Sequence, residues 1–483
     1  MTVERPSIEP IKSHRRLRYL SDEQLERMQT ATLEILEEVG VKFPSERALA
    51  TFDDHGAHVD HETQIVRIPP DLVHEAMGHV PRTFHVGARD PSCEFDLEDG
   101  VTYFTTDGCG VETIDFETRE RRSSRKEDVA RMAHIADYLS SVAFYWPMVS
   151  AQDHGKTAPL HELDAGWNNT VKHVQSETLM GEKSARYAIQ MGTVIAGSKE
   201  ELRRHPVFSV VICTIAPLVQ DKHGIESATA LAEAQVPVGF LAMPTLGTTA
   251  PATLAGALVV GDAEVISATV LMQLVNPGAP VFHSIMQGWA DPRSGNYVPY
   301  PLDSRCRYAP VEMAHHWGMP SFGGAFGTMS EEPGTWQAAA DVSLDPLLVS
   351  LAGAEWVTGI GLNDSFTLLY PEAIILDDDL YHRARYALAE MKTDPEAVAL
   401  DVIRDVGPGG HFLGEKHTRK HMPTAMKPAV TQQTGPDGRY REPREVAREK
   451  VKWILENYQP QPLEKAKQDE LTRILDAADE ELG

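Results

Sequence analysis

The fold is constrained most strongly by a repeated alternation of short apolar segments and helical stretches between about residues 100 and 365. Eight apolar segments, spaced roughly 30 to 40 residues apart, begin at Thr102, Ala143, Val171, Phe208, Val236, Pro280, Pro320 and Glu355. Helical patterns lie between them, at residues 126–139, 184–196, 224–234, 251–274, 304–317 and 334–352. Eight strand–helix units predict an α/β fold, a (β/α)8 TIM barrel. A doubly wound open sheet is the alternative, and it fits a count of eight less naturally.

The sequence on either side of this repeat predicts helical additions. Residues 1–85 are interpreted as an N-terminal helical cap, in which Ser21 and Gln24 form a capping box and Gly40 ends the first helix. Residues 86–375 are the predicted barrel catalytic domain, and residues 376–483 a C-terminal helical extension. A hairpin-like insertion at residues 111–122 makes the first barrel unit the least regular.

The composition restricts the class of partner. The formal net charge is −26, which repels nucleic acids and anionic membranes, so neither is an expected partner. Four cysteines without a CxxC pair, and an N-terminus without an apolar signal segment, predict reduced thiols and a cytoplasmic location. The most apolar stretch, residues 251–275, carries Asp262 and Glu264 and is therefore predicted to be a buried helix.

Enzymes with this fold place their active sites at the C-terminal ends of the strands. The residues expected at those ends are Asp107, Ser150, Glu177, Thr214, Met243, Ser284, Gly327 and Asn363. Aromatic residues lie near them, namely Tyr103, Phe104, Trp146, Trp289, Phe326 and Trp336. Each candidate also has a purely structural interpretation. Asp107 and Glu177 could cap helices or form ion pairs, and Trp146, His173 and His283 could belong to the core.

A metal-dependent barrel hydrolase is a weaker hypothesis. His173, Glu177 and His283 could supply ligands, but the first strand, "TYFTTDGCG", lacks the HxH pair typical of many such hydrolases. The segment "GPGGHFLGEKHTRKHM", residues 407–422, places His417 and His421 four residues apart without the glutamate of a zinc protease, and it is not a P-loop. We expect this segment to close the barrel, or else to lie near a partner at its mouth, with metal ligation the remaining interpretation. No directly bound metal is expected.

The residue types at the strand ends favour another chemistry. They lack an obvious pair of nucleophile and base, and they combine aromatic rings with one or two carboxylates. A quaternary ammonium ion cannot donate hydrogen bonds, so ring faces and nearby negative charge are what can hold it. The sequence is therefore compatible with a pocket for a quaternary amine.

Six sequence blocks carry a resemblance to a known family. They are "LERMQTATLEILEEVGVKF", "GAHVDHETQIVRIPPDLVHEAM", "TIDFETRERRSSRKEDVARMAHIADYL", "GMPSFGG", "WQAAADVSLDPLLVSLAGAEWV" and "GHFLGEKHTRKHM". In this combination, over about residues 15 to 470, the chain resembles the trimethylamine methyltransferase family. The resemblance implies a (β/α)8 barrel with extra helices. It also implies methyl transfer from an amine to the cobalt of a corrinoid (cobalamin) carried by a cognate partner protein.

One departure from the family pattern bears on the substrate. The family's namesake carries pyrrolysine late in the barrel, whereas this chain has only standard residues around positions 329–333. The chain thus resembles the non-pyrrolysine branch, which implies a quaternary amine whose methyl group is already activated by positive charge. Glycine betaine is the first candidate, and carnitine, proline betaine and choline-like cations stay open.

With this mechanism the cobalt is the nucleophile, so no catalytic residue is expected in the chain. The candidate ring donors are Tyr103, Trp146, Phe326 and Trp336, with Asp107 and Glu177 as charge partners. Candidate donors to a substrate carboxylate are His173, His283 and Arg307, and candidate glycines for close approach of the corrinoid are Gly323, Gly324 and Gly327. A homo-oligomer is expected. The alternative of another class is a non-catalytic binding protein for a quaternary amine.

Overall fold

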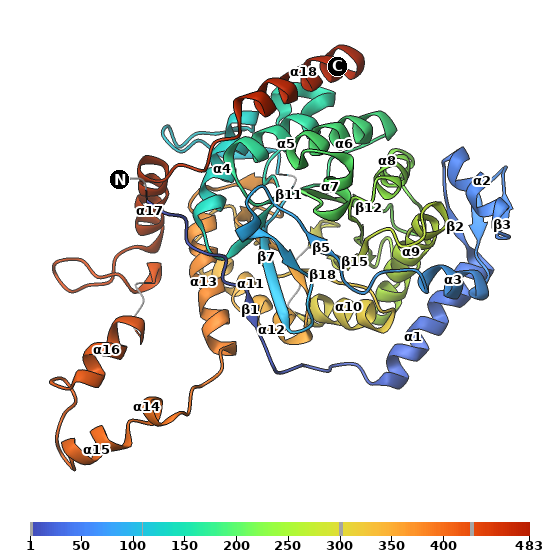
Figure 1. The fold of residues 1–483 in the computed structure, drawn as a ribbon. Coiled ribbons are helices and arrows are strands. Elements are labelled where there is room, and N and C mark those ends of the chain that lie inside the picture. The colour runs from blue at the N-terminus through green and yellow to red at the C-terminus, as the bar shows by residue number, and fades with distance from the viewer. Residues whose placement is uncertain (1–2, 109, 299–302, 426–428) are drawn as a thin grey trace.

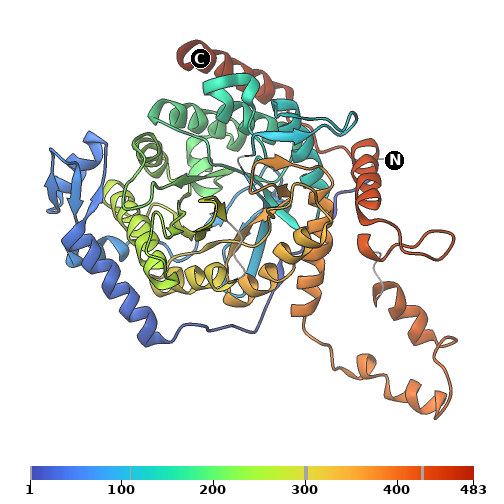
Figure 2. The same cartoon turned by 180° about the vertical axis from the view of Figure 1, so that it is seen from behind.

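The computed structural model describes residues 3–108, 110–298, 303–425 and 429–483. Eight parallel strands form a barrel (Figures 1 and 2). In order around the barrel they are β7 (Val101–Thr106), β10 (Val142–Tyr145), β11 (His173–Ser176), β12 (Phe208–Cys213), β13 (Val238–Ala242), β15 (Val281–Ile285), β18 (Phe322–Gly324) and β19 (Trp356–Ile360). A parallel bridge between His283 and Ser321 joins β15 to the start of β18 and closes the ring. The predicted barrel is therefore confirmed, and the open sheet is excluded.

Helices surround the barrel and shield the outer faces of its strands (Figure 2). They are α4 (Lys126–Tyr138), α5 (Ala158–Asn169), α6 (Glu182–Ala196), α7 (Lys199–Arg204), α8 (Lys222–Glu233), α9 (Leu254–Val275), α10 (Arg305–His316), α11 (Trp336–Val342), α12 (Asp345–Ala352) and α13 (Ala373–Leu388). The insertion after β7 forms the predicted hairpin, β8 (Glu112–Ile114) and β9 (Arg121–Ser123), which pair antiparallel.

Helix α9 is long and apolar enough to cross a membrane by length and composition, yet 83% of its most apolar window is buried within the protein. It contacts β13 and β15 on one side and the N-terminal helices on the other. Its two acids are satisfied inside the fold: Asp262 accepts a hydrogen bond from Trp317 at 2.9 Å, and Glu264 accepts one from the Leu218 amide at 2.8 Å. This double-sided packing explains why the helix is apolar around most of its circumference.

The N-terminal cap contains a small sheet as well as helices. Helix α1 (Asp22–Glu34) begins with the predicted capping box of Ser21 and Gln24. It continues as a π-helical turn, η1 (Ile35–Val39), which ends at Gly40 with a φ of +82°. Helices α2 (Glu46–Asp54) and α3 (Pro70–Met77) follow. They flank an antiparallel sheet of β2 (Val41–Lys42), β4 (Ile65–Arg67) and β3 (His58–Asp60).

Aromatic side chains fill the barrel interior. Trp356 contacts Phe282, with ring centroids 4.5 Å apart, and Phe144, at 5.2 Å. A hairpin of β5 (His85–Val86) and β6 (Phe95–Asp96) covers the N-terminal ends of the strands, and the Phe95 ring stacks on Tyr103 at 3.9 Å. This hairpin plugs one end of the barrel, and we call the opposite end, where the strands have their C-terminal ends, the mouth.

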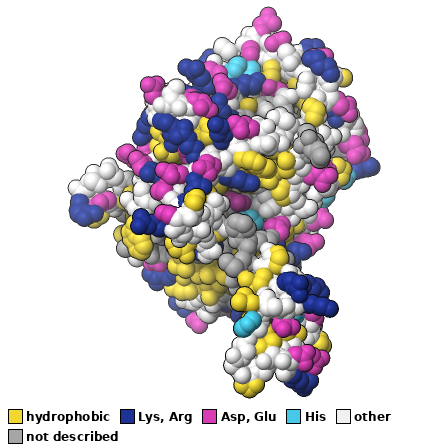
Figure 3. Space-filling view, turned by 90° about the vertical axis from the view of Figure 1, so that its left-hand side faces the viewer, with side chains coloured by type: hydrophobic (Ala, Val, Ile, Leu, Met, Phe, Trp, Pro, Cys, Tyr) yellow, Lys and Arg dark blue, Asp and Glu magenta, His cyan; other side chains and the backbone are white. Residues whose placement is uncertain are grey.

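An arm extends from the C-terminal region. It consists of α14 (Pro395–Val398), α15 (Leu400–Val406) and α16 (Lys416–Ala425), and it projects away from the barrel (Figures 1 and 3). Helices α17 (Pro443–Asn457) and α18 (Lys465–Leu482) then return and pack on α13 and α6. The segment 407–422 lies on this arm, where His417 Nε2 is 3.0 Å from the Glu396 carbonyl oxygen. The expectation that this segment closes the barrel is therefore wrong.

Candidate active site

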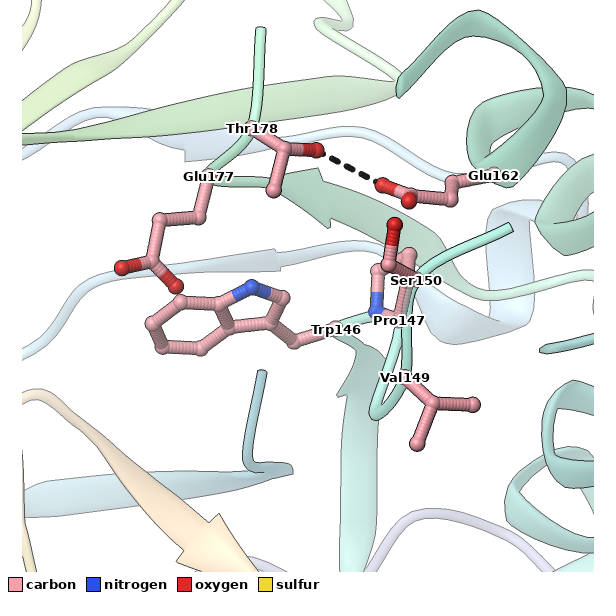
Figure 4. Close-up of a pocket in the computed structure, with 7 residues that line it drawn as sticks. All are labelled: Trp146, Pro147, Val149, Ser150, Glu162, Glu177 and Thr178. Atoms are coloured by element: carbon pink, nitrogen blue, oxygen red, sulfur yellow. Dashed lines mark hydrogen bonds between the residues drawn. The ribbon is translucent and has the colours of Figure 1, made fainter. Parts of the chain in front are cut away.

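A small cavity lies at the mouth, just beyond the ends of β10 and β11 (Figure 4). Its free volume is about 10 Å³, room for about one water molecule, so a larger ligand requires the lining side chains to move. Its lining residues are Trp146, Pro147, Val149, Ser150, Glu162, Glu177 and Thr178. Trp146 and Glu177 are each the first residue after a barrel strand, which is where this fold places functional side chains.

The backbone around β7 fixes the position of the Trp146 indole. The Trp146 amide donates to Thr106 Oγ1 at 3.0 Å, and the Thr106 hydroxyl donates to the Trp146 carbonyl oxygen at 2.6 Å. Gly108 lies directly against the ring, since a Cβ at this position would overlap Nε1 and Cε2 of Trp146. The side chain is only 3% exposed and contacts Phe322 inside the barrel. The indole is therefore held in one place at the top of the core.

Asp107 ends the neighbouring strand as a buried carboxylate. Its Oδ1 accepts from the Gly108 amide at 2.9 Å and from the Thr358 hydroxyl at 3.3 Å. Its Oδ2 is buried and has no hydrogen-bond partner within the described chain. Burial, with the charge of Glu177 acting in the same direction, raises the pKa of Asp107 to about 7. A cation placed beside Oδ2 would supply the missing partner.

Two further carboxylates border the cavity. Glu177 Oε1 accepts from the Cys213 thiol at 3.1 Å, and burial together with the Glu177 charge raises the pKa of that thiol well above its usual value. Glu162, on α5, accepts from the Ala151 amide at 3.0 Å and from the Thr178 hydroxyl at 2.7 Å, and burial raises its pKa. Figure 4 shows the Glu177 carboxylate beside the Trp146 indole, and the Glu162 carboxylate on the other side of the view, near Ser150 and bonded to Thr178. Two acids thus line the cavity, and Glu177 is the one next to the ring.

One guanidinium reaches the mouth from α10. Arg307 is 5% exposed, and its Nε lies 3.4 Å from Asp345 Oδ2. Its Nη1 would be 3.7 Å from a Cβ on Gly324, so Arg307 lies over the inward side of β18. The positive charge lowers the pKa of Asp107, in opposition to the larger effect of burial. Of the three predicted donors to a substrate carboxylate, Arg307 is the one that the structure places at the mouth.

His173 and His283, the other two predicted donors to a substrate carboxylate, lie away from the mouth. His173 is the first residue of β11, at the plugged end, where Nδ1 bonds the Gly87 carbonyl at 2.9 Å and Nε2 bonds Ser209 Oγ at 2.9 Å. Its burial lowers its pKa to about 4. His283 points outward from β15, and its Nε2 is 2.9 Å from Asp262 on α9. The expectation that these histidines lie at the mouth is wrong, because strand alternation and position turn them away from it.

Three predicted ring donors also lie away from the cavity. Tyr103 belongs to the plugged end through its stacking on Phe95. Phe326 is 2% exposed and packs against Phe104, with centroids 5.8 Å apart, in the layer outside the barrel. Trp336 is 88% exposed at the start of α11. Of the four candidates, only Trp146 lines the cavity.

The three candidate glycines face different surroundings. A Cβ on Gly323 would meet Val349 of α12 at 2.9 Å, so Gly323 serves helix packing outside the barrel. Gly324 faces Met286 and Arg307 on the inner side. Gly327, at φ +105°, lies beyond the end of β18, in a backbone conformation that favours glycine.

Sequence reasoning missed Glu162 and Thr178, and it did not connect Cys213 with the site. Glu162 lies within a helix that also carries Asp164, so nothing in the local pattern separates it from a solvated glutamate. Thr178 directly follows Glu177, and position alone could have indicated it. Cys213 is the last residue of β12, and the rule that strand ends form the site could have found it.

The fold and the mouth together define a TIM-barrel protein with a buried, acidic pocket built around one indole. Within the described chain, the residues lining the cavity do not include a hydroxyl or thiol paired with a histidine base.

The chain belongs to the trimethylamine methyltransferase (MTTB) family, which it matches over residues 3–483. Trimethylamine methyltransferase MttB of Desulfitobacterium hafniense is 32% identical over 470 residues, covering 96% of this chain and 94% of the relative. A glycine betaine methyltransferase of the same species is 28% identical over 454 residues, covering 92% and 94%. The crystal structure of the Methanosarcina barkeri monomethylamine methyltransferase MtmB is 13% identical, with a TM-score of 0.49 over 95% of this chain and 93% of that one. That structural likeness is too distant to bear on function. By family membership the protein is a methyltransferase.

Proposed function

We propose that the protein transfers a methyl group from a quaternary amine, with glycine betaine as the first candidate, to the Co(I) of a corrinoid carried by a partner protein. The observation that carries the proposal is the pocket that Trp146, Glu162 and Glu177 line, with the buried Asp107 carboxyl close enough for the Glu177 charge to raise its pKa. A desolvated ring face with nearby carboxylates is what recognises a tetraalkyl cation. Standard residues at positions 329–333, and the similarity to a relative named glycine betaine methyltransferase, support a quaternary substrate.

The chain's own residues would act by binding and orientation. Trp146 and the carboxylates would hold the ammonium, and Arg307 would receive a substrate carboxylate. Because the substrate loses its positive charge during transfer, a very deep cation trap would oppose the reaction. A carboxyl with a pKa of about 7, as in Asp107, is only partly charged near neutral pH and would therefore bind the substrate cation with moderate strength. Burial of the pocket would exclude water from the reacting methyl group.

The residues at the mouth fit a large planar methyl acceptor. The corrinoid, when docked, would supply the nucleophilic cobalt, and a neutral tertiary amine would leave without a general acid. On the protein side, Gly324 and Gly327 carry no side chains of their own in the β18 region, although Met286 and Arg307 lie against Gly324. The pocket below them would present the substrate methyl group toward the docked partner.

The test is a methyl-transfer assay with reduced cobalamin, read from its spectral change on mixing with the protein and one amine at a time. We expect methylcobalamin from glycine betaine or another quaternary amine, and much less from trimethylamine. Equal turnover of trimethylamine and betaine would contradict the substrate argument. Saturable betaine binding without methylcobalamin, also in the presence of a corrinoid protein, would favour a non-catalytic binding protein. The alternative of a metal-dependent hydrolase is weakened, because His173 and His283, its proposed metal ligands, do not lie at the mouth.

We also propose a cytoplasmic homo-oligomer. The arm supports this, because it leaves large apolar side chains at least 45% exposed. They are Val398, Leu400, Ile403, Phe412, Leu413 and Met422. Light scattering on the intact protein should give a mass above that of one chain, and Leu413→Ser with Phe412→Ser should reduce it. A monomeric wild type would contradict this proposal.

A further inference from the structure

Three potential metal ligands converge at the plugged end of the barrel, opposite the mouth. They are His85 on β5, Glu94 just before β6, and His205 at the end of α7. We propose that they bind a divalent transition-metal ion, Zn²⁺ by preference, at a structural site that is independent of the methyl-transfer proposal. Two imidazoles and one carboxylate are a ligand set typical of zinc.

Two of the three separations match what such an ion requires, and the third, between His85 Nε2 and His205 Nδ1, is within 4.8 Å. Glu94 Oε2 is 3.4 Å from His85 Nε2 and 3.4 Å from His205 Nδ1. A tetrahedral ion with bonds of about 2.0 to 2.1 Å holds its ligand atoms about 3.3 to 3.4 Å apart. These separations are too long for good hydrogen bonds, and both nitrogens are buried without a hydrogen-bond partner within the described chain. An ion between the three atoms would satisfy both nitrogens at once.

The surroundings hold these ligands in place. His85 Nδ1 is 2.9 Å from Asp96 Oδ1, which orients Nε2 toward Glu94 in the carboxylate–histidine–metal arrangement seen around bound metals. The hairpin reaches His205 because residue 87 is glycine: a Cβ there would lie 2.5 Å from the His205 carbonyl carbon. The Gly87 amide donates to the Pro206 carbonyl at 3.0 Å, beside the ligand. The two segments are thus joined before any ion binds.

A second cluster of similar composition is a poor candidate for a metal site. His154, His161 and Asp479 also bring three ligand atoms together. However, the Lys126 ammonium lies 2.9 Å from His161 Nδ1, and the two imidazoles stack at 3.5 Å. A positive charge at this distance opposes a cation. This cluster therefore provides a matched control.

The proposed ion would fasten the β5–β6 hairpin to the segment leading into β12. That hairpin carries Phe95, which covers the lower end of the barrel core. Binding of a ligand to the folded state alone stabilises that state by mass action. The consequence is a metal-dependent thermal stability, without any role for the ion in methyl transfer.

The test uses full-length protein without a polyhistidine tag, stripped of metal with a chelator and titrated with Co²⁺ as a spectroscopic substitute for zinc. We expect one equivalent to bind with the visible bands of tetrahedral cobalt, Zn²⁺ to displace it, and Zn²⁺ to raise the Tm. His85→Ala and His205→Ala should each weaken binding at least about tenfold, and Asp96→Asn by about tenfold. His154→Ala should bind as the wild type does.

Each variant is compared with the wild type by its Tm without metal, so a misfolded variant is recognised. His205 is 45% exposed, and its alanine variant should fold normally. The proposal is overturned if Co²⁺ gives no tetrahedral bands, or if His205→Ala binds as tightly as the wild type. Loss of binding in His154→Ala, with binding kept in His85→Ala, would overturn it as well. None of these readouts depends on methyl transfer, so the two proposals fail separately.

Discussion

Gly108 and Trp146 are in such close contact that a methyl group on Gly108 would overlap the indole nitrogen. The backbone of Gly108 does not have a positive φ, so alanine is strained there only by its contact with the ring. We expect Gly108→Ala to displace the indole and raise the KM for a quaternary amine by about tenfold or more, since 1.4 kcal/mol is a factor of ten. Steady-state kinetics measure this. Gly414→Ala on the arm, where a Cβ meets nothing within 4 Å, is the control and should leave KM unchanged.

Replacement of Trp146 by leucine separates recognition from packing. A desolvated cation–π contact is worth about 2 kcal/mol, so Trp146→Leu should raise KM roughly 10- to 30-fold. Phe326 is buried in the layer outside the barrel, and Phe326→Leu should instead lower the Tm and leave KM unchanged. KM and Tm are measured on both variants. An unchanged KM in Trp146→Leu would show that the indole is only core.

The charge of Asp107 should make substrate binding depend on pH. Its pKa of about 7 means that the carboxyl is mostly neutral at about pH 6 and mostly charged at about pH 8. Because a cation prefers the charged form, we expect kcat/KM for a quaternary amine to rise as pH increases through about 7. Asp107→Asn should remove that rise and lower kcat/KM at high pH. A rise that persists in Asp107→Asn would assign the titration to another group.

The Asp107 carboxyl should also make the stability of the protein depend on pH, and here the stability should fall as pH rises. Its pKa is about 7 in the folded protein and about 3.9 in an unfolded chain, so the folded state binds the proton more tightly. The resulting stability is complete below about pH 4 and is lost as pH rises through 7. Relative to Asp107→Asn, the wild type should therefore lose Tm between about pH 5 and pH 8. Glu264, whose pKa burial also raises to about 7, is present in both proteins and cancels in the comparison. Asp377 does not cancel fully, because the Asp107 charge adds to the burial that raises the pKa of Asp377 to about 7, and Asp107→Asn removes that charge.

The barrel could be predicted from sequence because each strand is a short apolar run followed by a helix, a pattern that local residues carry. The sequence was a poorer guide to which face of a strand, toward the barrel interior or toward the helices, each residue occupies. His283 lies outside the barrel because it alternates with Phe282 and Ser284, and a shift of one residue would reverse that assignment. Glu162 was missed because its place in the pocket depends on how α5 packs on β11. Such tertiary relationships have no local signal.

Arg307 should distinguish betaines from cations without a carboxylate. It is the predicted donor that lies at the mouth, close to Gly324 and paired with Asp345 at 3.4 Å. Hydrogen bonds to charged groups contribute about 1.5 to 3 kcal/mol, so Arg307→Met should raise the KM for glycine betaine by roughly tenfold or more. The KM for choline should change little or fall, because a like charge has been removed.

The variant also leaves Asp345 without its guanidinium in a buried position, which by itself could disturb the site. Burial already raises the pKa of Asp345, so the carboxyl should take up a proton, and the double variant Arg307→Met with Asp345→Asn makes that neutral state permanent. If the guanidinium binds the substrate carboxylate, the double variant should show the same selective loss of betaine binding as the single variant. An equal rise in KM for betaine and choline in both variants would mean that Arg307 organises the mouth and does not read the carboxylate.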